Sequence, residues 1–109
     1  MEKKYNKLVR DNIPNIIEQD NEIPFTRTLS EAEYRIKLQE KLFEECHELI
    51  SATSRKDIIK ESSDVLEIIK SIAELNKISL EEVMEEANQR RLTRGGFSKR
   101  IYLEKTITK

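Results

Sequence analysis

Three helix-start signals, at Ser30, Ser54 and Ser79, divide the middle of this 109-residue chain into long helical segments. Ser30 and Ser79 are each followed three residues later by a glutamate. This is the capping-box arrangement, in which serine and glutamate each satisfy a free backbone N–H group at the helix start. A weaker form occurs at Ser54, where an aspartate follows at the same spacing. These signals predict long helices over residues 31–52, 55–75 and 80–92.

The two ends of the chain differ from this helical middle. Pro14 and Pro24 favour short, irregular structure, with room for a strand over residues 5–9 and a brief helix over 14–19. Gly95 and Gly96 end the helical region, and the apolar residues after them favour a strand over 97–103 that pairs with 5–9. The predicted fold is therefore all-α. We expect a single domain over residues 1–109, an antiparallel helical bundle with a small terminal β-ribbon, completed by oligomerisation.

The scarce residue types exclude several kinds of protein. The only two glycines are adjacent. The chain therefore contains neither the dinucleotide-binding motif G-x-G-x-x-G nor the P-loop motif G-x-x-x-x-G-K-[ST]. Cys46 and His47 are the only residues of their types, which excludes an intrachain disulfide and a Cys/His zinc site. No apolar run is long enough for a spanning helix or a standard signal peptide. We therefore expect a cytoplasmic protein that does not insert into membranes.

Carboxylates interrupt the apolar faces of the first two long helices. At about 100° per residue, Glu45 falls inside the apolar arc of the first helix, and Glu48 lies about 60° to one side of it. Glu61 projects into the arc of the second helix, with Asp64 at its edge. The 12 residues between the pairs are enough to end one helix, turn and begin an antiparallel neighbour, so the pairs are expected to face each other. The arcs consist of Tyr34, Leu38, Leu42 and Leu49, and of Val65, Ile68, Ile72 and Leu75.

Four like charges in a shared, partly dry space require compensation. Each would cost roughly several kcal/mol to desolvate. A hard divalent cation is the simplest answer, and carboxylate oxygens suit Mg²⁺, with Mn²⁺ as an alternative. The other interpretation is that the acids are solvated or paired with nearby cations of the second helix. These cations are Lys60, Lys56 and Arg55.

Around these acids the sequence resembles the MazG-like all-α nucleoside triphosphate pyrophosphohydrolases, whose signature is E-x-x-E followed after a short interval by E-x-x-D. The segments 42–49 (LFEECHEL) and 61–67 (ESSDVLE) carry this signature. The ends, 5–11 (YNKLVRD) and 95–103 (GGFSKRIYL), are similar to a small branch of phosphoribosyl-ATP pyrophosphohydrolase-like "house-cleaning" proteins.

The resemblance implies a function for particular residues. The Mg²⁺ ligands it implies are Glu45, Glu48, Glu61 and Asp64. It also implies that Asn88 and Arg91, three residues apart on one face of the last helix, reach substrate phosphate. A protein of this kind is implied to work as a dimer or higher homo-oligomer. It splits a nucleoside triphosphate into monophosphate and pyrophosphate.

A cluster of five cations without an intervening acid lies near the C-terminus. It predicts an anion site, in which Arg94 or Lys99 helps Arg91 to neutralise phosphate charge. The alternative is a solvated basic tail. The net charge of −1 and the aromatic content of 6% argue against nucleic acid as the ligand. The cluster consists of Arg90, Arg91, Arg94, Lys99 and Arg100.

Two hypotheses for the function remain. In the first, the chain is a Mg²⁺-dependent pyrophosphohydrolase acting on a standard or modified nucleoside triphosphate or on a related phosphoribosyl nucleotide, with Glu48 or Glu45 as the base. Lys7 and Arg10 would add substrate contacts if the terminal ribbon folds back; otherwise Arg10 pairs with Asp11 on a surface strand. In the second hypothesis, the chain is a non-catalytic helical oligomer that binds a nucleotide or a protein partner.

Overall fold

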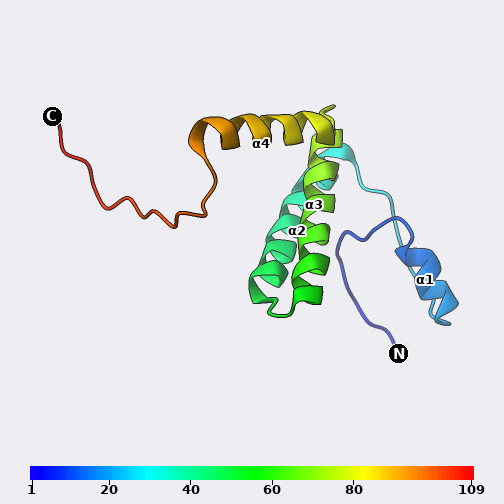
Figure 1. Cartoon of the computed structure of the whole chain (residues 1–109). Coiled ribbons are helices and arrows are strands. Elements are labelled where there is room, and N and C mark those ends of the chain that lie inside the picture. Colours follow the sequence, from blue (N-terminus) through cyan, green and yellow to red (C-terminus); the bar gives the residue numbers. More distant parts are fainter.

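The computed structural model describes residues 1–109 and contains four α-helices, which are joined and flanked by irregular segments (Figure 1). The helices are α1 (Ile13–Gln19), α2 (Glu31–Ser51), α3 (Arg55–Leu75) and α4 (Leu80–Arg94). The all-α class predicted from the sequence is confirmed, as are the three long helices and the brief helix after Pro14. None of the four helices combines the length and apolar character that crossing a bilayer requires.

The predicted helix starts are confirmed atom by atom. The Ser30 Oγ accepts a hydrogen bond from the Glu33 N–H at 3.3 Å, and the Glu33 carboxylate accepts one from the Ser30 N–H at 3.4 Å. Ser79 and Glu82 form the same reciprocal pair at 3.2 and 3.1 Å. At Ser54 only the hydroxyl contact is present, with the Asp57 N–H donating at 3.1 Å. These caps satisfy backbone groups that a helix cannot satisfy itself.

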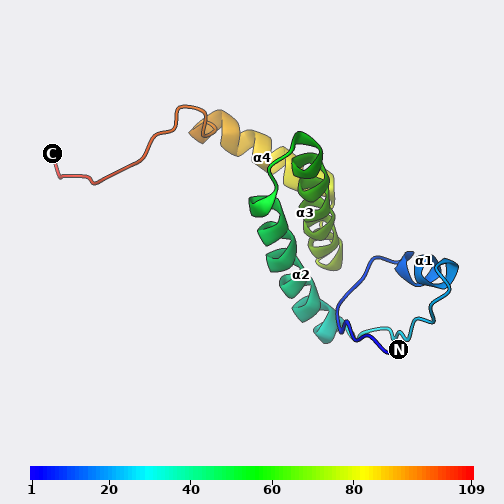
Figure 2. The same ribbon diagram turned by 90° about the horizontal axis from the view of Figure 1, so that it is seen from below.

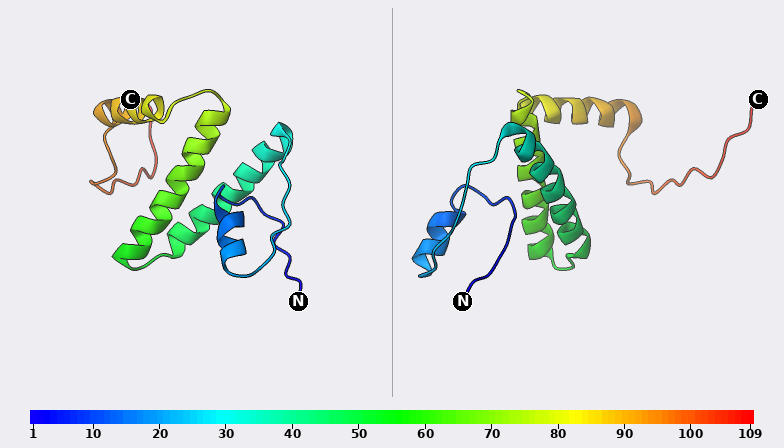
Figure 3. Two further views of the ribbon diagram at one scale, coloured as in Figure 1. Left: turned by 90° about the vertical axis from the view of Figure 1, so that its right-hand side faces the viewer. Right: turned by 180° about the vertical axis from the view of Figure 1, so that it is seen from behind.

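Helices α2 and α3 form an antiparallel hairpin, seen from two sides in Figure 3, and the core of the chain lies along their contact. Leu38 of α2 is 2% exposed, and Ile68 and Ala73 of α3 are 9% and 6% exposed. The other apolar residues predicted to face inward are half-buried, namely Tyr34, Leu42, Leu49, Val65, Ile72 and Leu75. The predicted apolar arcs are therefore the two sides of this seam.

Helix α4 runs across the end of the hairpin that lies opposite the α2–α3 turn, and it packs against α3 alone (Figure 1). Its C-terminus is closed by Gly95, whose N–H donates to the Arg91 carbonyl at 2.8 Å and whose φ is 81°. Beyond Gly95 the chain leads away from the helices without a regular element.

The structure has no strand, so the predicted terminal β-ribbon is not confirmed. Residues 5–9 run beside the hairpin, whereas residues 97–103 follow α4 outward on the other side of the molecule (Figures 1 and 2). The two segments cannot pair within one chain because α4 carries the second away from the first. Backbone pairing requires strands about 4.8 Å apart.

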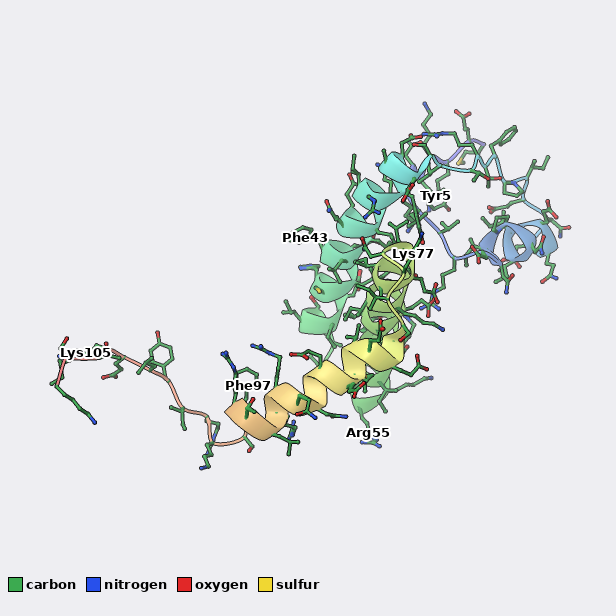
Figure 4. All side chains as sticks on the ribbon, turned by 90° about the horizontal axis from the view of Figure 1, so that it is seen from above. Tyr5, Phe43, Arg55, Lys77, Phe97 and Lys105 are labelled. Carbon is green, nitrogen blue, oxygen red and sulfur yellow. The ribbon has the colours of Figure 1, made fainter.

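The chain is far more open than a compact domain of its size. Its accessible surface is 10522 Å², against about 6,300 Å² for a compact 12.9 kDa protein. Its radius of gyration is 18.9 Å, against about 13 Å expected for this length. Large apolar side chains lie in water, and Phe43, 80% exposed, projects from α2 on the side away from α3 (Figure 4).

Candidate metal centre

Three carboxylates meet between α2 and α3. Glu45, Glu61 and Asp64 each offer one oxygen, and these oxygens all lie within 4.8 Å of one another. The antiparallel turn brings them together, because Glu45 lies six residues before the end of α2 and Glu61 lies six residues after the start of α3. Their side chains are 14%, 14% and 25% exposed, so all three are partly withdrawn from water. The prediction that carboxylates from two helices face each other is correct for these residues.

Each carboxylate of this cluster has a cationic partner. Lys41 Nζ lies 3.5 Å from Glu45 and is itself only 16% exposed on its side chain. Lys60 Nζ lies 3.0 Å from Glu61 and 3.6 Å from Asp64. The sequence offered an alternative in which nearby cations pair with the acids. The contacts of Lys60 with Glu61 and Asp64 agree with that alternative. They also raise the pKa of Lys60, first through the hydrogen bond to Glu61 and then through the charges of Glu61 and Asp64.

A third cation reaches the cluster from outside the hairpin. Arg10 Nη2 donates to Asp64 Oδ1 at 2.8 Å, a contact that joins residues 54 positions apart in the chain. Arg10 therefore pairs with Asp64 and not with Asp11, its neighbour in the sequence. Lys7 lies nearby and contacts Glu44 of α2 at 4.0 Å.

The donor set fits a hard divalent cation. All three donors are carboxylate oxygens, the ligands that Mg²⁺ and Mn²⁺ prefer, and three of them leave coordination positions for water or phosphate. Ligands of one Mg²⁺ at about 2.1 Å lie roughly 3 to 4 Å apart. The three oxygens, all within 4.8 Å of one another, are therefore near the spacing that one cation requires.

Glu48, the fourth predicted ligand, is not part of this cluster. It is exposed and lines a neighbouring hollow of about 240 Å³ at the α2–α3 turn, which it shares with Glu61. Ala52 is the one hydrophobic residue among the six that line the hollow. Glu48 thus lies beside the three-carboxylate cluster, at the edge of an open space.

The residues predicted to bind phosphate lie far from the carboxylates of their own chain. Asn88, Arg91, Arg94 and Lys99 are exposed on α4 and just beyond it, where the labelled Phe97 marks the end of the helix (Figure 4). Along the helix axes, Leu75 is about 16 Å from Asp64, and Arg91 is about 16 Å from the start of α4. The structure does not bring these two sets of predicted site residues together within one chain.

Gly96, the second glycine after α4, lies close to the side chain of Arg91. A Cβ atom built on Gly96 would lie 3.2 Å from the Arg91 guanidinium carbon, tighter than ordinary contact. The Arg91 guanidinium, which was predicted to reach phosphate, therefore lies beside Gly96.

Sequence analysis missed one cation of the site, Lys41, and it missed the partner of Arg10. Lys41 could have been found, because it precedes Glu45 by four residues and so lies on the same face of one helix. The partner of Arg10 had no such signal, because Asp64 is reached only when the N-terminal segment folds against the hairpin.

Comparison with protein families gives one match, and it covers most of the chain. The model of the family described as phosphoribosyl-ATP pyrophosphohydrolase matches residues 5–91, which include all three carboxylates of the cluster, Glu48 and Arg10. Comparisons with curated proteins and with solved structures give no match.

Proposed function

Because this chain belongs to the phosphoribosyl-ATP pyrophosphohydrolase family, within the MazG-like all-α superfamily, we propose that it is a Mg²⁺-dependent pyrophosphohydrolase. The family places it among hydrolases of pyrophosphate bonds. The proposed substrate is a nucleoside triphosphate, standard or modified, or a related phosphoribosyl nucleotide, and the products are the monophosphate and pyrophosphate. The observation that supports this function best is the cluster of Glu45, Glu61 and Asp64 between α2 and α3.

In this proposal the three clustered carboxylates hold the metal ion. A divalent cation bound there supplies charge neutralisation to the triphosphate oxygens and lowers the pKa of a nearby water. Lys41 and Lys60 neutralise the acids when no divalent cation is bound. Their flexible side chains, on the same two helices, can turn away when the cation takes their place.

Glu48 is the proposed general base. It stands apart from the three ligands yet shares the hollow at the α2–α3 turn with Glu61, which supports a role beside the metal instead of on it. Its carboxylate takes a proton from the attacking water as the water oxygen bonds to phosphorus. The phosphoanhydride bond between the α- and β-phosphorus then breaks, and pyrophosphate leaves with the electron pair of the bridging oxygen when the water attacks the α-phosphorus.

The proposal includes a homo-oligomer, either a dimer or a larger assembly. An accessible surface of 10522 Å² and only three buried residues leave much apolar surface for another copy to cover, including Phe43 and Leu92, each 80% exposed. The distance between α4 and the carboxylates of the same chain supports a site shared between copies. Asn88, Arg91, Arg94 and Lys99 of one copy would then approach the cluster of another and neutralise phosphate charge.

The test is a pyrophosphate-release screen of the purified protein against standard and modified nucleoside triphosphates and phosphoribosyl-ATP, with Mg²⁺ and with chelator. We expect metal-dependent release with at least one substrate and its loss in Glu61→Gln. Glu40→Gln is the matched control, because Glu40 lies on α2 but pairs with Lys37, away from the cluster. Release that persists in chelator, or in Glu61→Gln, would contradict the proposal.

The same preparation separates the enzyme from a non-catalytic oligomer. A cation bound only by the folded chain raises the melting temperature by mass action. We expect Mg²⁺ to raise the Tm of the wild-type protein and of Glu40→Gln but not of Glu61→Gln. If no substrate yields pyrophosphate and Mg²⁺ does not change the Tm, the result would favour the non-catalytic oligomer that binds a nucleotide or a protein partner.

A further inference from the structure

The N-terminal segment, residues 1–29, is attached to the hairpin at the candidate metal centre. Helix α1 within it packs against none of the other three helices, and it lies apart from them in Figures 1 and 2. Two ion pairs join residues 1–12 to the hairpin, Arg10 with Asp64 at 2.8 Å and Lys7 with Glu44 at 4.0 Å. The shorter of the two uses a carboxylate of the three-membered cluster.

Both oxygens of Asp64 are already engaged. Oδ1 accepts from Arg10, and Oδ2 lies 3.6 Å from Lys60. A cation that takes Asp64 as a ligand therefore competes with Arg10 for the same carboxylate, and two positive charges at one carboxylate oxygen repel each other.

The three cationic side chains at the cluster differ in how much of the chain must move when each leaves its carboxylate. Lys41 and Lys60 lie on α2 and α3 beside their partners, so each can leave its carboxylate by a change of side-chain rotamer. Arg10 comes from a separate part of the chain, residues 1–12, whose one short ion pair to the hairpin is the pair of Arg10 with Asp64. Loss of this contact leaves residues 1–12 with the pair of Lys7 and Glu44, at the limit of ion-pair distance.

We propose that the pair of Arg10 and Asp64 is a latch that divalent-cation binding opens. Without metal, Arg10 acts as a counter-ion of the cluster and holds the N-terminal segment against the hairpin. When the cation binds, Arg10 leaves Asp64, and the segment is released with its guanidinium free to meet substrate phosphate. This inference rests on the proposed function, because it takes the cluster as the metal site.

The affinity for Mg²⁺ tests the competition. The pair is partly solvated, with side-chain exposures of 57% for Arg10 and 25% for Asp64, so its effect is modest. We expect Arg10→Ala to bind Mg²⁺ about two- to fivefold more tightly than wild type in isothermal titration without nucleotide. Arg27→Ala is the matched control, because Arg27 also joins the N-terminal segment to α2 but through Glu33, outside the cluster. Its Mg²⁺ affinity should equal that of wild type.

Hydrogen exchange tests the release. In wild type and in Arg27→Ala, Mg²⁺ should increase amide exchange in residues 5–19. In Arg10→Ala, exchange there should already be high without Mg²⁺ and should not change when Mg²⁺ is added. Mg²⁺ binding without a change in exchange, or with equal affinity in Arg10→Ala and wild type, would overturn the latch.

The two proposals fail in different ways. A protein that binds Mg²⁺ and releases the segment but liberates no pyrophosphate would contradict the proposed function and leave the latch supported. A protein that hydrolyses its substrate with Mg²⁺ but keeps residues 5–19 protected would contradict the latch alone. A wild-type protein that binds no Mg²⁺ would contradict both.

Discussion

Glu48 differs from the other three acidic residues of the motif in where its side chain lies. Glu45 and Glu48 are three residues apart on α2, so their side chains leave the helix about 60° apart. Glu45 lies in the seam with α3 and is 14% exposed, whereas Glu48 is exposed at the neighbouring hollow. On α3, Glu61 and Asp64 both turn toward the seam. One residue of the four is therefore free for a role other than holding the cation.

Replacement of Glu48 by glutamine should separate catalysis from metal binding. Glu48→Gln keeps the shape of the side chain but cannot accept a proton, so we expect kcat to fall by about 10²- to 10⁴-fold. The Mg²⁺ Kd, measured by isothermal titration, should stay close to that of wild type. Asp64→Asn should weaken Mg²⁺ binding clearly. If Glu48→Gln weakens Mg²⁺ binding as much as Asp64→Asn does, Glu48 is a ligand and not the base.

Helix α2 begins with the most strongly perturbed carboxylate of the chain. The Arg27 guanidinium donates to the Glu33 carboxylate at 2.9 and 3.3 Å. This contact, with the backbone hydrogen bond from Ser30, lowers the pKa of Glu33 to about 2. One residue thus serves both the capping box and an ion pair to the segment that leads into the helix. The start of α2 therefore loses a charged contact when Glu33 becomes protonated.

The pH dependence of stability should show this contact. Because the pKa of Glu33 is lower in the folded chain, its contribution is complete above the ordinary pKa of about 4.5 and is lost as pH falls toward about 2. In Glu33→Gln we expect a shallower loss of Tm between these pH values than in wild type. Glu31→Gln is the control from the same first turn. Thermal unfolding followed by circular dichroism measures both, and identical slopes in wild type and Glu33→Gln would contradict the assignment.

The whole chain exposes surface that a folded protein normally buries. Helix α4 and the segment after it carry a basic cluster away from the acidic one, and they leave Leu92 and Phe97 80% and 97% exposed. In the proposed homo-oligomer, α4 of one chain covers the hairpin of another, which would bury this surface and bring the two clusters together. The proposed catalytic site is then assembled from two chains.

Mixing two inactive variants tests a shared site. Glu61→Gln damages the carboxylate cluster and Arg91→Ala the cation on α4, so each variant alone should be inactive. In a dimer with shared sites, one of the two sites of each mixed dimer combines intact parts. Random mixing should then restore about a quarter of wild-type activity. Sedimentation of the mixture confirms assembly. If assembly occurs without recovered activity, the two sets of residues serve the same chain's site or none.

Local spacing in the sequence was enough to predict most of the helical structure. The capping serines, the apolar arcs of α2 and α3 and the glycine that ends α4 act over a few residues, so the helix ranges were predicted nearly to the residue. The meeting of Glu45 with Glu61 and Asp64 was also predictable. A short turn between two amphipathic helices leaves one arrangement that buries both apolar faces.

The contacts between distant segments were decided by the tertiary structure. The predicted ribbon does not form, Arg10 pairs with Asp64, Glu48 stands outside the cluster and α4 leads away from it. The absence of the ribbon, the partner of Arg10 and the course of α4 do not depend on a repeat or a spacing within one helix. These features depend on the positions of whole segments relative to the hairpin. Many weak contacts with the rest of the fold together determine those positions. Sequence alone determined the helices and the acids that face each other, because those follow from short-range geometry, whereas the one cation that reaches these acids from a distant segment, Arg10, was decided by the packing of the chain.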